Sequence, residues 1–75
     1  MPHFLFRRFP GQGWERVQSL GDNPAEAASA EAALRQQHAE VEAAALAEAA
    51  KHRDADVRTV SAPSEDEALK DLYSA

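Results

Sequence analysis

The residues that could do chemistry in this chain are three histidines, five serines and a large set of carboxylates. His3, His38 and His52 do not have the spacing of a known metal-binding motif. In the pairs His38–Glu42 and Glu48–His52, one helical turn separates imidazole and carboxylate. Such pairs would suit a metal shared by two chains, but a surface ion pair is the simpler interpretation. The serines have no nearby base and no glycine elbow. We therefore predict no catalytic residues, no bound metal and no enzyme activity.

Other patterns of chemical interest have structural explanations. The chain contains no cysteine, which excludes disulfides, thiolate metal sites and cysteine nucleophiles. Gly11-Gln12-Gly13 lacks both the lysine and the following helix of a phosphate-binding loop. The carboxylates of residues 65–67 stand at the start of a predicted helix, where they complement the helix dipole. The sequence therefore predicts no cofactor.

The first fourteen residues hold four of the five aromatic side chains, interleaved with arginines. Aromatic and arginine side chains on a sheet are typical of platforms that stack single-stranded nucleic acid. A hydrophobic core is the better interpretation here, because the rest of the chain offers few large apolar residues. We therefore expect most of these rings to be buried.

Charge is unevenly distributed along the chain, whose net charge is −5. Residues 1–20 carry three arginines against one glutamate, a net charge of +2, and residues 21–75 carry five basic and twelve acidic residues, a net charge of −7. Since phosphate contacts dominate nucleic-acid affinity, the acidic body argues against direct nucleic-acid binding. It favours a basic partner if the charge serves recognition, although solubility alone is a sufficient reason for it.

A β-hairpin is predicted over residues 3–20. Residues 3–9 alternate so that Phe4 and Phe6 share one face while Leu5 and Phe9 share the other. Residues 10–13 (PGQG) have strong turn chemistry, and residues 14–20 suit a second strand. The first strand therefore has apolar side chains on both of its faces.

A long alanine-rich helix is predicted over residues 24–53. Asn23 suits the N-cap, Pro24 suits the first helical position, and no glycine or proline follows up to Arg53. Thirteen alanines lie between residues 25 and 50, and residues 51–53 (KHR) complement the negative end of the helix dipole. An unbroken helix would be about 45 Å long at 1.5 Å per residue, whereas typical strands are about 17–20 Å long. We therefore expect the helix to bend, to break near residues 36–38, or to project from the domain.

The remaining elements are a strand over residues 57–62 and a short helix over residues 65–73. The strand is rich in β-branched residues, and Ser64 with Glu67 forms a capping box before the helix. The predicted fold is a single small α+β domain of order β-β-α-β-α. Its two-layer core is a three-stranded antiparallel sheet, with strand order 2-1-3, packed on one long helix, plus the short C-terminal helix.

A protein-interaction function follows from the two-sided hairpin. One long helix covers only one face of a three-stranded sheet, so the other face needs the C-terminal helix, a second copy of the chain in a homodimer, or another protein. Small chains with lean cores often depend on a partner. We predict a small non-catalytic protein-interaction module or assembly subunit, an accessory subunit of a multi-chain enzyme being one form of it. The candidate interface residues are Arg7, Phe9, Trp14, Arg16 and Leu46.

An acidic inhibitor is the alternative. It would bind a nucleic-acid-binding protein and block its basic DNA or RNA groove. In size, acidity and absence of cysteine the chain is similar to small phage-encoded anti-defence proteins, including CRISPR inhibitors, although no motif matches one such family. The candidate acidic face comprises Glu40, Glu42, Glu48, Asp54 and Asp56. Steep salt dependence of binding would favour this alternative, since an apolar interface tolerates salt.

A cytoplasmic location is predicted from three observations. No apolar run approaches the roughly 20 residues of a membrane span. The apolar start of the chain is too short for a signal peptide, and arginines follow it instead of preceding it. The absence of cysteine fits a reducing compartment. We therefore expect no membrane partner.

Overall fold

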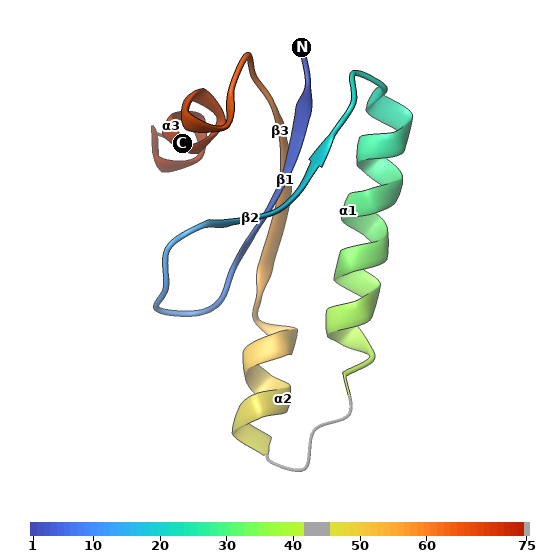
Figure 1. Cartoon of the computed structure of the whole chain (residues 1–75). Helices are drawn as coiled ribbons and strands as arrows, with labels where there is room; N and C mark the ends of the chain where they lie inside the picture. Colours follow the sequence, from blue (N-terminus) through green and yellow to red (C-terminus); the bar gives the residue numbers. More distant parts are fainter. Residues whose placement is uncertain (42–45, 75) are drawn as a thin grey trace.

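The computed structural model describes residues 1–41 and 46–74 and shows a three-stranded antiparallel sheet with helices on both sides (Figure 1). The elements in chain order are β1 (His3–Arg8), β2 (Glu15–Leu20), α1 (Pro24–Ala39), α2 (Leu46–Arg53), β3 (Asp56–Ser61) and α3 (Glu65–Ser74). The strand order is β2-β1-β3. The predicted α+β class, antiparallel sheet and strand order are therefore confirmed. Within the described residues, no helix combines the length and the apolar character needed to cross a membrane.

The two faces of β1 are buried in different clusters, as the alternating pattern predicts. On one face, Phe4 and Phe6 pack with Ala62 of the β3–α3 connection and with Ala68 and Leu72 of α3. On the other face, Leu5 packs with Leu20, Val57, and Ala27 and Leu34 of α1. Figure 1 shows α1 and α3 on opposite sides of the sheet. The C-terminal helix thus covers the face that the long helix leaves open.

The helical region predicted over residues 24–53 is interrupted, which is one of the three outcomes that its length allowed, and the chain forms two helices there. The first ends at Ala39, where Glu40 leaves the helical conformation and its backbone N–H donates to the carbonyl of Gln36 at 3.0 Å. The second begins at Leu46, and Figure 1 shows it returning toward the start of β3. A return shortens the connection to β3, which a continuous helix of about 45 Å would overshoot. The break follows the predicted region, residues 36–38, by two residues.

Local signals place the other boundaries within one residue of the prediction. Asn23 caps α1, its side-chain oxygen accepting a hydrogen bond from Ala25 N–H at 2.9 Å. Ser64 caps α3 by accepting from Glu67 N–H at 3.3 Å. The third strand spans residues 56–61 instead of 57–62, and α3 extends to Ser74 instead of residue 73. Side-chain capping therefore fixes both helix starts, in agreement with the sequence.

The two edges of the sheet are treated differently. Along β2, Leu5 is paired with Gln18 and Phe6 with Arg16, so Val17 is an extra residue that forms a β-bulge. Along β3, the outward Thr59 N–H donates to the Glu31 carboxylate at 3.2 Å. The outward carbonyl of Val57 accepts from Arg35 at 2.9 Å. One edge is thus irregular, and the other is capped by side chains of α1.

Candidate functional site

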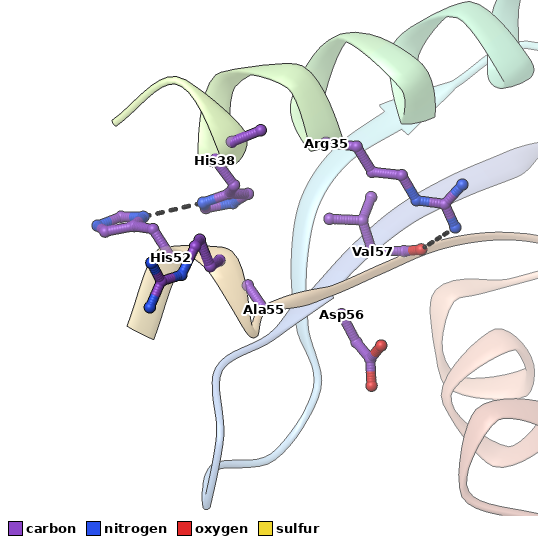
Figure 2. Close-up of a pocket in the computed structure, with 8 residues that line it drawn as sticks. Arg35, His38, His52, Ala55, Asp56 and Val57 are labelled. Carbon is purple, nitrogen blue, oxygen red and sulfur yellow. Dashed lines mark hydrogen bonds between the residues drawn. The ribbon is translucent and has the colours of Figure 1, made fainter. Parts of the chain in front are cut away.

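The most unusual contact in the described structure joins two histidines from different helices. His38 lies in the last turn of α1 and His52 in the last turn of α2, and their Nδ1 atoms are 2.9 Å apart. Figure 2 shows the two rings pointing toward each other across the gap between the helices. The ring centres are 5.1 Å apart with planes inclined by 27°. That separation is the N–N distance plus about one ring radius on each side, so the nitrogens face each other edge to edge.

This geometry fixes the protonation of the pair. A hydrogen bond between two imidazole nitrogens needs one N–H and one lone pair, so at least one ring must be neutral at Nδ1. Both histidines lie near helix C-termini, where the dipole favours a positive charge. The hydrogen bond is therefore compatible with neither ring or one ring protonated, and it is lost when both are.

The imidazole rings of His38 and His52 both lie against the ring of Phe9. His38 and His52 meet it edge-on, with ring centres 5.6 and 5.4 Å from its own. The guanidinium of Arg7 and the ammonium of Lys51 lie 4.7 and 4.5 Å from its centroid. Four nitrogenous groups from β1, α1 and α2 thus surround one aromatic ring, whose negative faces attract cations.

Burial and neighbouring positive charge lower the pKa of His38. The side chain is 7% exposed. Desolvation is the largest cause of the lowered pKa, followed by the charges of Arg7 and His52. Its Nε2 atom is buried without a hydrogen-bond partner. Protonation would place a second N–H on this ring in a site that offers it no acceptor, which reinforces the preference for neutral His38.

A cavity of about 290 Å³ lies beside the pair, between α1, α2 and β3 (Figure 2). Its polar lining residues are Arg35, His38, His52, Arg53 and Asp56. Arg35 reaches over the cavity to the Val57 carbonyl, and Asp56 is paired with Arg8 at 2.9 Å. Among the residues that the structure describes, no group of three or more metal-ligating side chains is present. We name the His38–His52 pair, Phe9 and this cavity the histidine pocket.

A second cluster surrounds Trp14 on the other side of the sheet. The ring is half-buried against the Phe4–Phe6 cluster. The guanidinium carbons of Arg8 and Arg58 lie 4.6 and 5.8 Å from the ring centroid. These distances allow cation–π attraction, which strengthens when the groups lose water. The cluster therefore presents an aromatic ring and two permanent positive charges together.

Tyr73 of α3 ties this cluster to the C-terminal helix. Its hydroxyl accepts a hydrogen bond from the backbone N–H of Trp14 at 2.9 Å, although the residue is 62% exposed. A Cβ at Gly13 would lie only 2.8 Å from that hydroxyl, so a glycine is needed for the close approach. Trp14, Tyr73, Arg8 and Arg58 are hereafter the Trp14 surface.

The predicted interface residues divide between these two places. Trp14 belongs to the Trp14 surface, whereas Phe9 belongs to the histidine pocket and Arg7 lies over the Phe9 ring. Arg7 is paired with Glu15 at 2.6 Å. Arg16, on β2, forms an ion pair with Glu65 and bonds Ser19 at 2.9 Å. The side chain of Leu46 lies outside the described residues. The sequence thus identified residues of both places without separating them.

The predicted acidic residues are scattered among different partners. Glu48 lies 3.6 Å from His52, and Asp56 is paired with Arg8. Glu40 accepts a hydrogen bond from Gln36 at 3.0 Å. Exposed Asp54 and Asp56 line one open hollow beside the hairpin turn. Glu42 lies outside the described residues. The Glu48–His52 contact is an ion pair only when the imidazole is protonated, so the ion-pair interpretation of that spacing stays a prediction.

Sequence reasoning missed the contact between His38 and His52. Fourteen residues along a continuous helix would separate them by about 21 Å, so only the break in the helix brings them together. A signal was present in the run of residues 51–53, whose basic character marked a helix end. Its counterpart, a single histidine at the end of α1, was too weak a signal to mark a second helix end.

No family model, curated protein or solved structure matches this chain.

Proposed function

We propose that this chain is a non-catalytic protein-binding module that contacts its partner through the Trp14 surface. The observation that carries the proposal is the surroundings of the half-buried Trp14. Two guanidinium groups lie beside its ring, and the hydroxyl of the exposed Tyr73 accepts a hydrogen bond from its backbone N–H. Tryptophan, tyrosine and arginine are the residue types that dominate interface hot spots. Trp14 also rests on the core, which orders the ring before binding and lowers the entropic cost of association.

The partner is expected to be a different protein with carboxylates on its surface. Residues 1–20 carry a net charge of +2, and Arg58 adds a further positive charge to the Trp14 surface. A symmetric dimer through this surface would bring its arginines against their own copies. Arg8 and Arg16 form ion pairs within the chain, but exposed pairs contribute little and can exchange partners.

Affinity capture with matched variants tests the proposal. Immobilised wild-type protein, Trp14→Ala, Arg58→Gln and Val17→Ala would be compared for the proteins they retain from a lysate of the source cells. Val17 is 39% exposed on β2 and serves as the apolar control. We expect one partner to bind the wild type and Val17→Ala but not Trp14→Ala, and to bind Arg58→Gln weakly. Equal capture of that partner by Trp14→Ala, with the circular dichroism spectrum unchanged, would overturn the proposal.

Light scattering at low and high salt tests the choice of partner. We expect a monomer at both salt concentrations. A dimer that survives high salt and is lost in Trp14→Ala would show that the Trp14 surface binds a second copy of the chain. That result would refute the expectation that the partner is a different protein.

The acidic inhibitor is less well supported by the arrangement of the carboxylates. Glu48 and Asp56 each have a positive or titratable neighbour within the chain, which reduces the charge they offer to a basic groove. The double variant Glu40→Lys with Asp54→Lys distinguishes the two functions. It leaves partner binding intact if the Trp14 surface is the contact, and abolishes binding if the acidic face is.

A further inference from the structure

Helix α2 depends on the histidine pocket for its position. None of the side chains of residues 47–53 is buried. The contacts of α2 with other elements include His52 with His38, His52 with Phe9, and Lys51 with Phe9. Elements with few buried apolar contacts open at lower free energy than the core. The hydrogen bond between the histidines is thus a major anchor of α2 to α1.

That anchor exists in only some protonation states. With neither or one ring protonated, one Nδ1 donates and the other accepts. With both rings protonated, both nitrogens are donors, so the bond is lost and two positive charges face each other. Acidification therefore changes the contact from attractive to repulsive.

The charges around the pair oppose the second proton. Positive side chains approach it from β1, α1 and α2, whereas the nearby carboxylates come from α2 and β3. The positive groups are Arg7, Arg35, Lys51 and Arg53, and the carboxylates are Glu48 and Asp56. Glu48 lies near His52 only, at 3.6 Å, and Asp56 is occupied by Arg8. The doubly protonated pair is therefore stable only after the helices separate and water enters.

We propose that the His38–His52 pair is an acid-sensitive latch that holds α2 over Phe9, and that protonation of both rings releases α2 and exposes the Phe9 ring. The release leaves the rest of the fold in place. The buried clusters on both sheet faces are built largely from α1, α3 and the strands, and neither includes a residue from the described side chains of α2, residues 47–53. The latch is distinct from the Trp14 surface, which lies on the other side of the sheet, and the Arg8–Asp56 ion pair is a contact between the two places.

Amide hydrogen exchange of the full chain at pH 7.5 and 5.0 tests the latch. After correction for the intrinsic pH dependence of exchange, we expect the amides of residues 49–53 to exchange clearly faster at pH 5.0 than at pH 7.5. The β1 amides should not change. The aromatic resonances of Phe9, measured by NMR, should shift over the same pH range, which gives a second readout if α2 exchanges too fast to follow.

His52→Asn is the decisive variant, because asparagine places a neutral donor and acceptor near the position of Nδ1. Its α2 exchange rate should be independent of pH between 7.5 and 5.0, and this rate is the readout for the variant because His38 still contacts Phe9. His3→Asn is the control, since His3 lies at the end of β1 remote from Phe9, and it should behave as the wild type does. Acid release that persists in His52→Asn, or wild-type α2 and Phe9 that do not respond to pH, would overturn the proposal.

Discussion

Two aromatic rings from the same hairpin, one on each side of the sheet, are each flanked by two cationic side chains. Trp14 has Arg8 and Arg58, and Phe9 has Arg7 and Lys51. The difference is in the third neighbour. The backbone N–H of Trp14 donates a hydrogen bond to the Tyr73 hydroxyl of α3. Phe9 instead lies against two imidazoles, which belong to α1 and α2. The same local arrangement is therefore insensitive to mild acid on one side and sensitive to it on the other.

The comparison also separates the side that we propose binds a partner from the side that we propose responds to pH. The Trp14 side carries permanent charges and rests on a helix with buried anchors, which suits a surface that must keep its shape. The Phe9 side is covered by a helix held largely through titratable groups, which suits a surface that changes with conditions. The predictions below test whether the two sides differ in this way.

The largest expected effect on the free energy of unfolding comes from truncating a buried leucine on either face of the sheet. Leu34 on the α1 side and Leu72 on the α3 side are each 8% exposed. Each change to alanine should lower the free energy of unfolding by about 2–5 kcal/mol, measured by urea denaturation. Similar costs would show that both faces are needed for the fold. A cost below about 1 kcal/mol on one side would mean that its helix is dispensable.

Phe9→Ala should lower the free energy of unfolding by about 1–3 kcal/mol, because the ring is only half-buried. It should also make the amides of α2 exchange faster already at pH 7.5, because both imidazoles lose the ring that they contact. Trp14→Ala is the matched change on the other side, and it should leave the exchange rate of α2 at pH 7.5 unchanged. Equal exchange rates of α2 in the two variants would remove the distinction between the sides.

The wild-type protein should lose stability as the pH falls from 8 to 5.5. Because the folded pKa of His38 is lowered from 6.5, the unfolded chain binds more protons than the folded chain in this range. The contribution of His38 is therefore complete above pH 6.5 and decreases as the pH falls below it. Urea denaturation of His38→Asn should show a shallower pH dependence, and His3→Asn should reproduce that of the wild type.

Tyr73→Phe should lower the free energy of unfolding by about 0.5–1.5 kcal/mol, the net value of one hydrogen bond to the Trp14 backbone. The change should be independent of pH between 5 and 8, because tyrosine does not titrate there. Thermal melts at both ends of this range provide the measurement, and a pH-dependent cost would contradict the assignment.

The smallest expected effect is that of Glu48→Gln, which removes the carboxylate beside His52. An exposed pair of this spacing contributes about 0.2–0.5 kcal/mol. The same variant should shift the acid release of α2 to slightly lower pH, because the carboxylate that favours a proton on His52 is gone. A shift to higher pH would contradict the electrostatic account of the latch.

Much of the fold was predictable because its signals are local. Alternation over residues 3–9 identified both faces of β1, and the caps at Asn23 and Ser64 identified two helix starts. A break near residues 36–38 was anticipated from the length of the helix, but the residue at which α1 ends was not predictable, because residues 39–45 contain no glycine or proline and alanine favours helix throughout. That end is decided by the position of β3, a tertiary requirement that helix propensity does not record.

The candidate sites followed the same rule. Trp14 could be recognised from residue type alone, since a lone tryptophan near arginines is a recurrent interface feature. Its contact with Arg58 depends on strand order, which the sequence also indicated. The histidine pocket depends on the chain reversal between α1 and α2. The sequence therefore identified His38 and His52 as titratable residues but did not predict that they are in contact.

The treatment of the sheet edges limits how this protein can associate. With a bulge at Val17 on one edge, and Glu31 and Arg35 occupying backbone groups of the other, neither edge presents a regular row of free hydrogen-bonding groups. Added strands, including those of identical chains, would have little to pair with, which is how natural sheets avoid growing into fibres. The sheet is therefore poorly suited to polymerise by strand addition, and the binding that we propose uses side chains instead of a free sheet edge.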